Sequence, residues 1–437
     1  MTSWGTCSTP TRRCGGGLPL LSPRGAVVAS VPNVGHHSVL RSLLRSDFQY
    51  QPLGILDDTH LRFFTHATLS KLFLDSGFLP DLVDTTVSPA DVHTLRALEP
   101  LQHHFRVDPS RARRHVEALQ YVVVGRPWGQ PDAQVPTTPL TFLVCVNDGH
   151  QLASNLLRSP CLAPGSPHQL VQLPGQTSAA AGFAAGLEQA EHDLVVLVQQ
   201  DIYLPAGWDR RFAYQLALAE QRFGRVGVAG VFGFDRTDDV PTHVGRVVDR
   251  DRLLDRPTPL PARVDSLDEI LLAVHRDSGL RLDPALGWHL YGADLVLQAQ
   301  RAGLEAVVLD APLLHNSLFS RVEETFHHAR EVLLDKWPDV RPFTTNMGRL
   351  DTMRPTPPTV TWDVELLGRV RALEARLAAS EERTRTAEAR TSAAETDRDR
   401  ARADRATARA RLQQLQARVA RMEQSVFWRA RRVLRRR

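Results

Sequence analysis

The chain has 437 residues, more than one ordinary domain needs, so we expect two or three folded units. Hydrophobic residues make up 42% of it, and no apolar run is long enough to span a bilayer. The net charge is +4, and no nucleic-acid-binding motif accompanies the arginines that carry it. The four cysteines lack the spacing of a zinc site. We therefore expect a cytoplasmic protein without a nucleic-acid partner, from a GC-rich bacterial genome.

The N-terminal part of the sequence predicts a small α/β module. Residues 1–24 have no usable periodicity, and we leave them unassigned, as a start that is not native to the protein. Residues 25–126 contain three strand-like runs with a helix, TLSKLFLDS, after the first, and the strands read GAVVASVP, FLPDLVDTTV and ALQYVVVGRP. The proline-rich residues 127–139 form the first predicted linker.

Residues 140–350 predict a larger α/β domain. Apolar strand-like runs alternate with segments of helical length, which is typical of a mostly parallel sheet with helices on its faces. The runs that carry this pattern are TFLVCVND, SAAAGFAAGLEQA, LVVLV, RVGVAGVFG and EAVVLDAP. Residues 351–362, which include RPTPPTV, form the second predicted linker.

The last part of the chain predicts a long helix. Residues 363–426 contain a single glycine and no proline, and apolar residues recur at alternating steps of four and three near both ends. This spacing favours a coiled coil through which the protein self-associates, the alternative being a lone solvated helix. The basic tail, residues 427–437, has the arginine and aromatic content of a segment that lies on an anionic membrane surface, the alternative being an idle basic end.

The N-terminal module resembles part of a known enzyme family. The segments SVPN, LDDTHLRFFT and the helix ending at SGF occur in the order found in the C-terminal half of class I S-adenosylmethionine-dependent methyltransferases, over about residues 18–125. The resemblance implies a partial Rossmann-like fold. The glycine-rich cofactor turn that such enzymes place after their first strand has no counterpart here, because the CGGG cluster follows no strand. We therefore expect neither S-adenosylmethionine binding nor methyl transfer by this chain alone.

A cluster of polar residues in the same module looks like a metal or acid–base site. The family comparison instead implies a loop on the substrate side, and without a methyl-donor site we favour loop packing for these residues: His36, His37, Asp57, Asp58, His60 and Arg62.

Residues 194–208, LVVLVQQDIYLPAGW, place a carboxylate directly after a buried strand. Ligands of open α/β sheets bind beyond the carboxyl ends of the strands, so Asp201 is positioned to meet a ligand or a metal. The alternative is an aspartate that caps a helix starting near Pro205.

The ordered motifs of residues 140–345 resemble a family-2-type glycosyltransferase, closest to streptomycin-biosynthesis-type domains. The resemblance implies the GT-A fold, a nucleotide-sugar donor, a glycan or lipid-linked cell-surface acceptor, and a divalent cation, Mg²⁺ or Mn²⁺. The residues it implies are Asn147, Asp148, Gln200 and Asp201 for the donor, Asp201 and His315 for the metal, and Asp294 as catalytic base or helix cap.

Two departures from this family leave other functions open. Gln199 and Gln200 stand where a full metal motif has further ligands, and Ala184 replaces an asparagine of many relatives. One alternative is a non-catalytic scaffold of degenerate enzyme domains. Another is a methyltransferase whose N-terminal half is missing from this reading of the gene. A glycosyltransferase that builds cell-surface glycans would dock at the inner membrane face, where the basic tail would place it.

Overall fold

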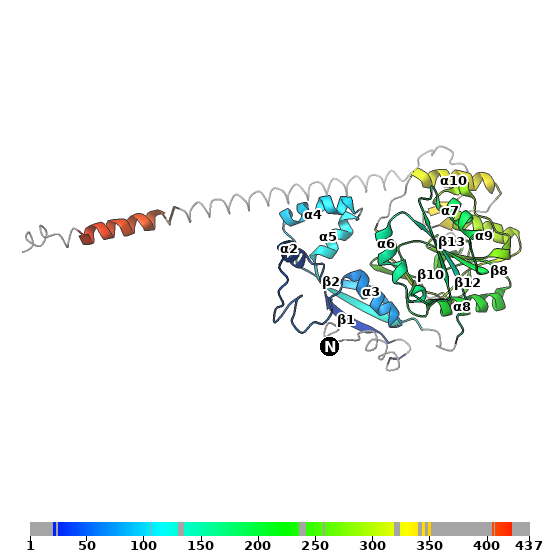
Figure 1. Cartoon of the computed structure of the whole chain (residues 1–437), viewed down its shortest axis with the longest axis horizontal. Helices are drawn as coiled ribbons and strands as arrows, with labels where there is room; N and C mark the ends of the chain where they lie inside the picture. Colours follow the sequence, from blue (N-terminus) through cyan, green and yellow to red (C-terminus); the bar gives the residue numbers. More distant parts are fainter. Residues whose placement is uncertain are drawn as a thin grey trace, which may run out of the picture. The chain divides into compact units, whose positions relative to one another are not determined.

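The computed structural model of the chain consists of two compact units, residues 1–352 and residues 353–437. It is a mixed α/β protein (Figure 1). No helix of its described part is long and apolar enough to cross a membrane. The structure describes residues 21–22, 25–105, 107–129, 135–235, 242–256, 258–318, 324–339, 343–345, 348–350, 404–405 and 407–421.

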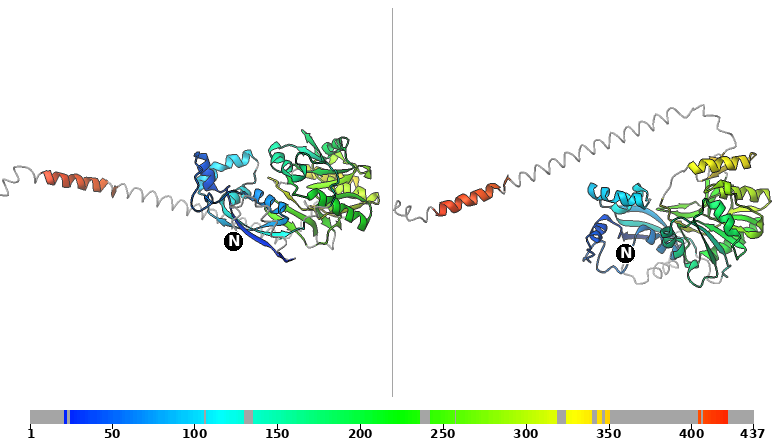
Figure 2. Two further views of the ribbon diagram at one scale, coloured as in Figure 1. Left: turned by 60° about the horizontal axis from the view of Figure 1, so that its bottom comes forward. Right: turned by 45° about the horizontal axis from the view of Figure 1, so that its top comes forward.

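The N-terminal module (residues 25–129) is built on a three-stranded sheet in the order β1-β3-β2. Both strand pairs are antiparallel. Its apolar core packs α3 against this sheet through Leu69, Phe73 and Phe78, and Figure 2 shows the module from two further directions. The three strands and the helix predicted here are confirmed. The elements are β1 (Val27–Pro32), α2 (His37–Leu44), α3 (His66–Asp75), β2 (Phe78–Val87), α4 (Val92–His104), α5 (Pro109–Glu117) and β3 (Ala118–Pro127).

The central module (residues 135–350) contains a seven-stranded sheet that is not mostly parallel as predicted. Three of its six strand pairs are parallel and three are antiparallel. Two of the antiparallel pairs involve β14, a strand that the sequence pattern did not reveal, and the third involves the short edge strand β12. In sheet order the strands are β12 (Ala262–Arg263), β15 (Glu305–Val308), β8 (Val226–Gly230), β14 (Leu271–His275), β6 (Leu194–Val198), β4 (Thr141–Val146) and β5 (Gln169–Pro174).

Helices cover both faces of this sheet, which explains the unbroken apolar run of β6. Val195 and Leu197 point into one core, whereas Leu194, Val196 and Val198 point into the other. A strand covered on both faces needs apolar residues at every position. The first core includes residues of α7 (Ala179–Leu187), α9 (Tyr291–Arg301) and α10 (Glu324–Lys336), and the second those of α8 (Trp208–Phe223) (Figure 1). The short helix α6 (Gly149–Ser154) follows β4.

A second sheet brings further strand ends beside the end of β6. Strand β10 pairs in parallel with β16, which sets Asp249 opposite His315. Strand β16 pairs antiparallel with β7, which sets His315 opposite Ile202. The strands of this sheet are β13 (Ser266–Leu267), β9 (Phe232–Asp235), β10 (Thr242–Asp249), β16 (Leu313–His315) and β7 (Ile202–Tyr203), with β11 (Arg252–Asp255) paired to β10. A separate hairpin joins β17 (Phe343–Thr345) to β18 (Gly348–Leu350).

The two modules of the first unit share a core. Trp128, in the segment predicted as a linker, is buried, and its Nε1 donates to Leu74 O at 3.3 Å. The residues of this shared core are Leu74, Leu79, Trp128, Tyr203, Val248 and Leu314. A ring–guanidinium contact between Trp128 and Arg211 adds to it. The N-terminal module is therefore packed into the same unit as the central sheets.

The second unit is described only in part. Residues 404–405 and 407–421 are helical, and every one of them is exposed. The predicted seam residues Leu412, Leu415 and Val419 are more than half exposed within this unit. A single described helix does not test self-association, so the coiled coil over residues 363–426 stays a prediction. Most of that segment and the basic tail, residues 427–437, lie outside the described residues.

Candidate functional site

Asp201 lies in the turn between β6 and β7, at the end of the seven-stranded sheet. The alternative prediction, that it caps the next helix, is wrong. Helix α8 begins at Trp208, and its N-cap position is Gly207, whose backbone is in the left-handed region at φ 75°. The carboxylate of Asp201 is free of that role, and its Oδ1 atom is buried without a hydrogen-bond partner in the described part of the chain.

The structure brings Asp201 together with His315, as the sequence predicted, and adds a third residue, Asp249. Nε2 of His315 lies 3.7 Å from Oδ2 of Asp201. Its Nδ1 lies 2.9 Å from Oδ1 of Asp249, within hydrogen-bond distance. Asp249 ends β10 after the apolar pair Val247 and Val248, so a strand ending in a carboxylate was the signal that could have revealed it. We call Asp201, Asp249 and His315 the strand-end cluster.

The electrostatics of the strand-end cluster favour positive charge. Burial lowers the pKa of His315, but the negative charge of Asp201 and the hydrogen bond and charge of Asp249 outweigh it, so the pKa is raised. Burial raises the pKa of Asp249, yet the bond and charge of His315 and the charge of Arg250, whose Nη2 lies 3.2 Å from Oδ2 of Asp249, bring it below the ordinary value. A proton or a metal ion between these carboxylates is therefore stabilised.

The predicted donor-binding residues meet at the ends of β4 and β6. Oε1 of Gln200 accepts hydrogen bonds from the backbone N–H groups of Asn147 and Asp148, at 3.1 and 3.0 Å. Nε2 of Gln200 donates back to the side-chain oxygen of Asn147. Asp148 caps α6 and accepts from the N–H groups of His150 and Gln151. Gln200 therefore has a definite task here, which is to hold the two strand ends together.

Asp294 does not lie open as a catalytic base would. Its side chain is 1% exposed, and it is occupied by three donors: Trp337 Nε1 at 2.7 Å, Gln298 Nε2 at 2.7 Å and Lys336 Nζ at 2.9 Å. It is not the cap of α9 either, because Leu290 holds that position. Its bonds to Lys336 and Trp337, at the end of α10, join α9 to α10.

A second carboxyl group lies beside the start of α9. Oε1 of Glu269 accepts from the N–H of Gly292 at 3.3 Å. A Cβ at Gly292 would lie 2.6 Å from Leu267 O, so this close approach requires glycine. Burial, and next the charge of Asp268, raise the pKa of Glu269 to about 8. The charge of Asp268 also acts on His315, so Asp268 connects the surroundings of Glu269 with the strand-end cluster.

The polar loop of the N-terminal module does not form the metal cluster that its residue types allow. His36 caps α2, and His37 contacts Ser88 O at 3.1 Å through Nε2. Asp57 accepts from the N–H and the hydroxyl of Thr59, and Nδ1 of His60 lies 3.3 Å from Ile55 O. Apart from the contact of His37 with Ser88, these contacts join neighbouring residues, as loop packing would. Asp58 N donates to Gln51 O in the same loop, and Arg62 also lies in it.

A different cluster, which sequence reasoning missed, lies between the two modules. His66 from the start of α3 and His115 from α5 meet Asp251 from the turn after β10, and their ligand-type atoms lie within 4.8 Å of one another. Nε2 of His115 lies 3.1 Å from Oδ1 of Asp251, and Nδ1 of His66 lies 3.6 Å from the same atom. We call these three residues the seam cluster. They are far apart in the sequence, so no local pattern reveals them.

Two arginines already neutralise the seam cluster. Nε of Arg111 lies 3.3 Å from Oδ1 of Asp251, and Nη2 of Arg114 lies 3.2 Å from Oδ2. Burial would raise the pKa of Asp251, but the bond from His115 and the nearby positive charges hold it far below its usual range. Burial lowers the pKa of His66 to about 3. A divalent ion here would face two guanidinium groups at close range, so we assign the seam cluster no metal.

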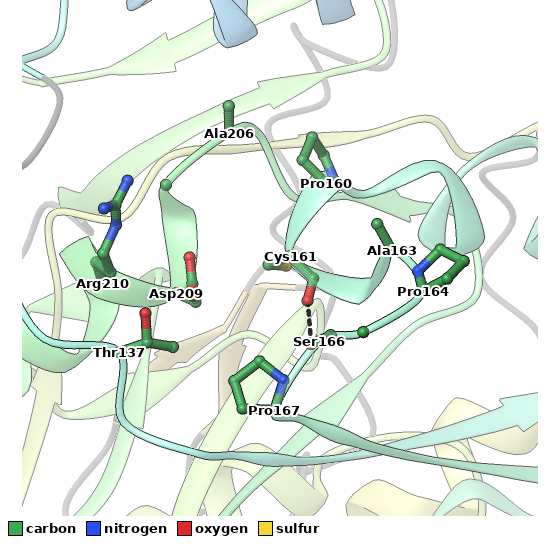
Figure 3. A pocket seen from close by; sticks show the side chains of 12 residues that line it. Thr137, Pro160, Cys161, Ala163, Pro164, Ser166, Pro167, Ala206, Asp209 and Arg210 are labelled. Carbon is green, nitrogen blue, oxygen red and sulfur yellow. Dashed lines mark hydrogen bonds between the residues drawn. The ribbon is translucent and has the colours of Figure 1, made fainter. Parts of the chain in front are cut away.

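A cavity of about 320 Å³ lies elsewhere in the central module (Figure 3). Its lining includes none of the predicted site residues and comes from Thr137, Pro160, Cys161, residues 163–167, Ala206, Gly207, Asp209 and Arg210. Cys161 lines it, but burial raises the pKa of that thiol far above the ordinary value. A thiol held neutral in this way is a poor nucleophile.

Comparisons with known proteins leave the family of this chain open. No family model matches it. The chain is 37% identical over 101 residues to a protein of Fuscovulum blasticum described as "ATP synthase subunits region ORF 6". That match covers 22% of this chain and 37% of the relative, so the chain spans just over a third of its length. Among solved structures, "Crystal Structure of A197 from STIV" aligns at a TM-score of 0.25 and 13% identity, over 43% of this chain and 99% of that one.

Proposed function

We propose that the central module is a glycosyltransferase of the GT-A type that takes its sugar from a nucleoside-diphosphate donor. The observation that carries this proposal is the strand-end cluster, which joins Asp201 and His315 beyond the carboxyl end of a buried strand. That position is where open α/β sheets bind ligands. The motif order seen in the sequence, and the strand ends that Gln200 ties together, point to the same edge.

The residues at this edge fit a divalent cation. Asp201 offers a buried oxygen atom that lacks a hydrogen-bond partner in the described part of the chain, and carboxylate oxygen is a preferred ligand of Mg²⁺ and Mn²⁺. His315 offers Nε2, while Asp249 accepts at Nδ1 and would fix the ring in the orientation that a ligand needs. When bound, the cation would stabilise negative charge on the departing diphosphate.

The protein's own groups would hold the rest of the donor. Asn147 and Asp148 follow β4, next to Gln200, and form the edge beside which the nucleotide would lie. Asp148 is already engaged as the cap of α6, so its carboxylate would keep the loop in shape rather than bind the nucleotide directly. A full metal motif would have a charged ligand at position 200. This chain has Gln200 there, and its neutral amide links two strand ends instead.

We assign the proton-accepting role to Glu269 in place of Asp294. Three donors occupy Asp294, and a base in that state would first have to give up hydrogen bonds. Glu269 lies beside the same helix start, and with a pKa of about 8 roughly a tenth of it is ionised at pH 7, in a form that accepts a proton readily. On this proposal Glu269→Gln lowers the transfer rate while donor binding persists, whereas Asp294→Asn acts first on folding.

The remaining roles follow from the proposed reaction. The acceptor would be a glycan or a lipid-linked glycan, the basic tail would bring the enzyme to the inner membrane face, and the long helix would join copies of the chain. We propose no role for S-adenosylmethionine. Calorimetry with S-adenosylmethionine tests that point directly, because micromolar binding would favour the methyltransferase alternative.

Full-length protein is the right material for the main test, because the two modules share a core. A thermal-shift screen with UDP, GDP and dTDP ligands in the presence of Mn²⁺ should show a stabilising nucleotide. Ligand at 100 times its dissociation constant adds about 2.7 kcal/mol to the free energy of unfolding. Asp201→Ala should remove the response, and Asp277→Ala, at an aspartate whose side chain is 78% exposed, should keep it. No response to any nucleotide would favour a non-catalytic scaffold, the alternative that Gln199, Gln200 and the occupied Asp294 support.

A further inference from the structure

The N-terminal module packs against the strands that carry the strand-end cluster, on the face opposite to that cluster. Tyr203, Val248 and Leu314 are buried in the shared core with residues of the N-terminal module. Successive side chains of a strand point to opposite faces. Asp249 and His315, the next residues after Val248 and Leu314, therefore point away from the N-terminal module while their strands rest on it.

Arg111 of α5 reaches from the N-terminal module to the segment that follows His315. Its Nη1 donates to Ser317 O at 2.7 Å, and its Nη2 donates to Oδ1 of Asn316 at 3.1 Å. Its Nε donates to Asp251 at 3.3 Å, and the side chain is only 11% exposed. The planar guanidinium therefore has three partners that fix its orientation.

Asn316 connects Arg111 to the strand-end cluster. Its backbone N–H donates to Asp201 O at 2.9 Å, so Asn316 is bonded directly to one of the proposed metal ligands and is covalently next to the other, His315. Its Nδ2 donates to Oδ1 of Asn155 at 3.2 Å, and Lys71 of the N-terminal module donates to that same oxygen at 3.2 Å. Both ends of the Asn316 side chain are thus linked to the N-terminal module, one of them directly and the other through Asn155.

We propose that Arg111 is a positioning residue for the strand-end cluster, and that the N-terminal module serves the central module by holding the 315–317 segment in place. This inference rests on the proposed function in so far as the cluster binds a metal. The part that concerns position does not: Arg111 fixes Asn316, and Asn316 fixes the spacing of Asp201 and His315. The seam cluster then has a purpose, because Asp251 orients the arginine that reaches Asn316.

The test uses full-length protein and two measurements. Amide hydrogen exchange of residues 313–318 reports on the Asn316-to-Asp201 hydrogen bond, and electron paramagnetic resonance titration gives the dissociation constant for Mn²⁺. Arg111→Ala should speed exchange of that segment and weaken Mn²⁺ binding about tenfold, which is typical of the loss of a group that orients metal ligands. Arg111→Lys should restore part of both. Asn316→Ala removes the partner of Arg111 and should weaken Mn²⁺ binding as much, which covers the case in which the arginine variants fail to fold.

Arg114→Ala is the matched control. Arg114 lies on the same helix and contacts the same aspartate, but within the described residues it bonds to Asp251 and not to residues 316–318. It should leave exchange and Mn²⁺ binding unchanged. Equal effects of Arg114→Ala and Arg111→Ala, or no change in Arg111→Ala, would overturn the inference. Wild-type protein that binds no Mn²⁺ would overturn the proposed function alone, because faster exchange in Arg111→Ala and not in Arg114→Ala would still support positioning.

Discussion

The strand-end cluster and the seam cluster consist of the same kinds of residues. Asp249 of the first and Asp251 of the second are two positions apart, at the end of β10 and in the turn that follows it. Each places an aspartate against histidine nitrogen atoms at 2.9 to 3.7 Å. In the strand-end cluster two carboxylates surround one histidine, and its pKa is raised. In the seam cluster two arginines share one carboxylate, and the pKa of His66 is lowered to about 3. The two clusters therefore differ in their balance of charge.

Ligand-like spacing alone therefore does not define a metal site. Only the seam cluster has three ligand atoms within 4.8 Å of one another in the described part of the chain, yet it already carries the positive charge that a metal would bring. The strand-end cluster has an unpartnered carboxylate oxygen, and among the described residues its two carboxylates face a single arginine, Arg250, which pairs with Asp249. Charge balance favours the second cluster as a cation site and the first as a structural joint.

The largest effect should follow from removing the centre of the seam cluster. Asp251→Ala would leave Arg111 without its carboxylate in a buried place, and losing one partner of a buried ion pair costs about 3–5 kcal/mol of the free energy of unfolding. Asp255→Ala, which removes the exposed partner of Arg246, is the matched control and should cost under about 1 kcal/mol. Urea denaturation measures both. Equal costs would mean that the seam cluster is not a joint.

The second-largest effect should be on Mn²⁺ binding, which should depend on the strand-end cluster and not on the seam cluster. Asp201→Ala should weaken it by at least about 100-fold, or ~2.7 kcal/mol, because a first ligand is lost where changing an orienting partner already costs 10- to 100-fold. His66→Gln should leave the affinity unchanged. If His66→Gln instead abolished binding and Asp201→Ala did not, the assignment of the two clusters would be reversed. Titration of full-length protein followed by electron paramagnetic resonance gives both constants.

The pairing of Asp201 with His315 could be predicted because each follows an apolar strand. Strand ends at one edge of a sheet meet in space, so a carboxylate at 201 and a histidine at 315 are expected together once the strands are identified. The antiparallel strand pairs of the seven-stranded sheet could not be predicted in the same way. Strand β14 reads LLAVH, and nothing in five residues tells whether a strand runs parallel or antiparallel to its neighbours.

The seam cluster could not be predicted because its residues are assembled only by the packing of two modules. His66 and His115 lie in helices of one module, and Asp251 follows a strand of the other. The hydrogen bonds of Asp294 could not be predicted either, because their donors Lys336 and Trp337 lie at the end of α10, 42 and 43 residues away. Motif order indicates which residues lie at a strand end or helix start, but not which donors surround them.

The seam cluster should also make stability depend on pH between pH 6.5 and about pH 3. The folded pKa of His66, about 3, lies below the unfolded value of 6.5, so the unfolded chain binds more protons in this window. The contribution of His66 to the free energy of unfolding is therefore fully present above pH 6.5. It decreases as the pH falls, by about 2 kcal/mol at pH 5. The groups around His66 are Asp251, His115, Arg111 and Arg114. Urea denaturation of His66→Gln should show a flatter profile, and an unchanged slope would rule out His66 as its cause.

The smallest effect should distinguish the two arginines of the seam cluster. Both contact Asp251, but the Arg114 side chain is 46% exposed and the Arg111 side chain 11%. Water screens the exposed pair, so Arg114→Ala should cost no more than about 1 kcal/mol of the free energy of unfolding. Arg111→Ala should cost more, because it removes the hydrogen bonds to Asn316 Oδ1 and Ser317 O as well as the contact with Asp251. Combining each with Asp251→Asn in a double-mutant cycle isolates the pairwise energies. A larger coupling for Arg114 than for Arg111 would mean that the exposed guanidinium holds Asp251, and the joint between the modules would then not depend on Arg111.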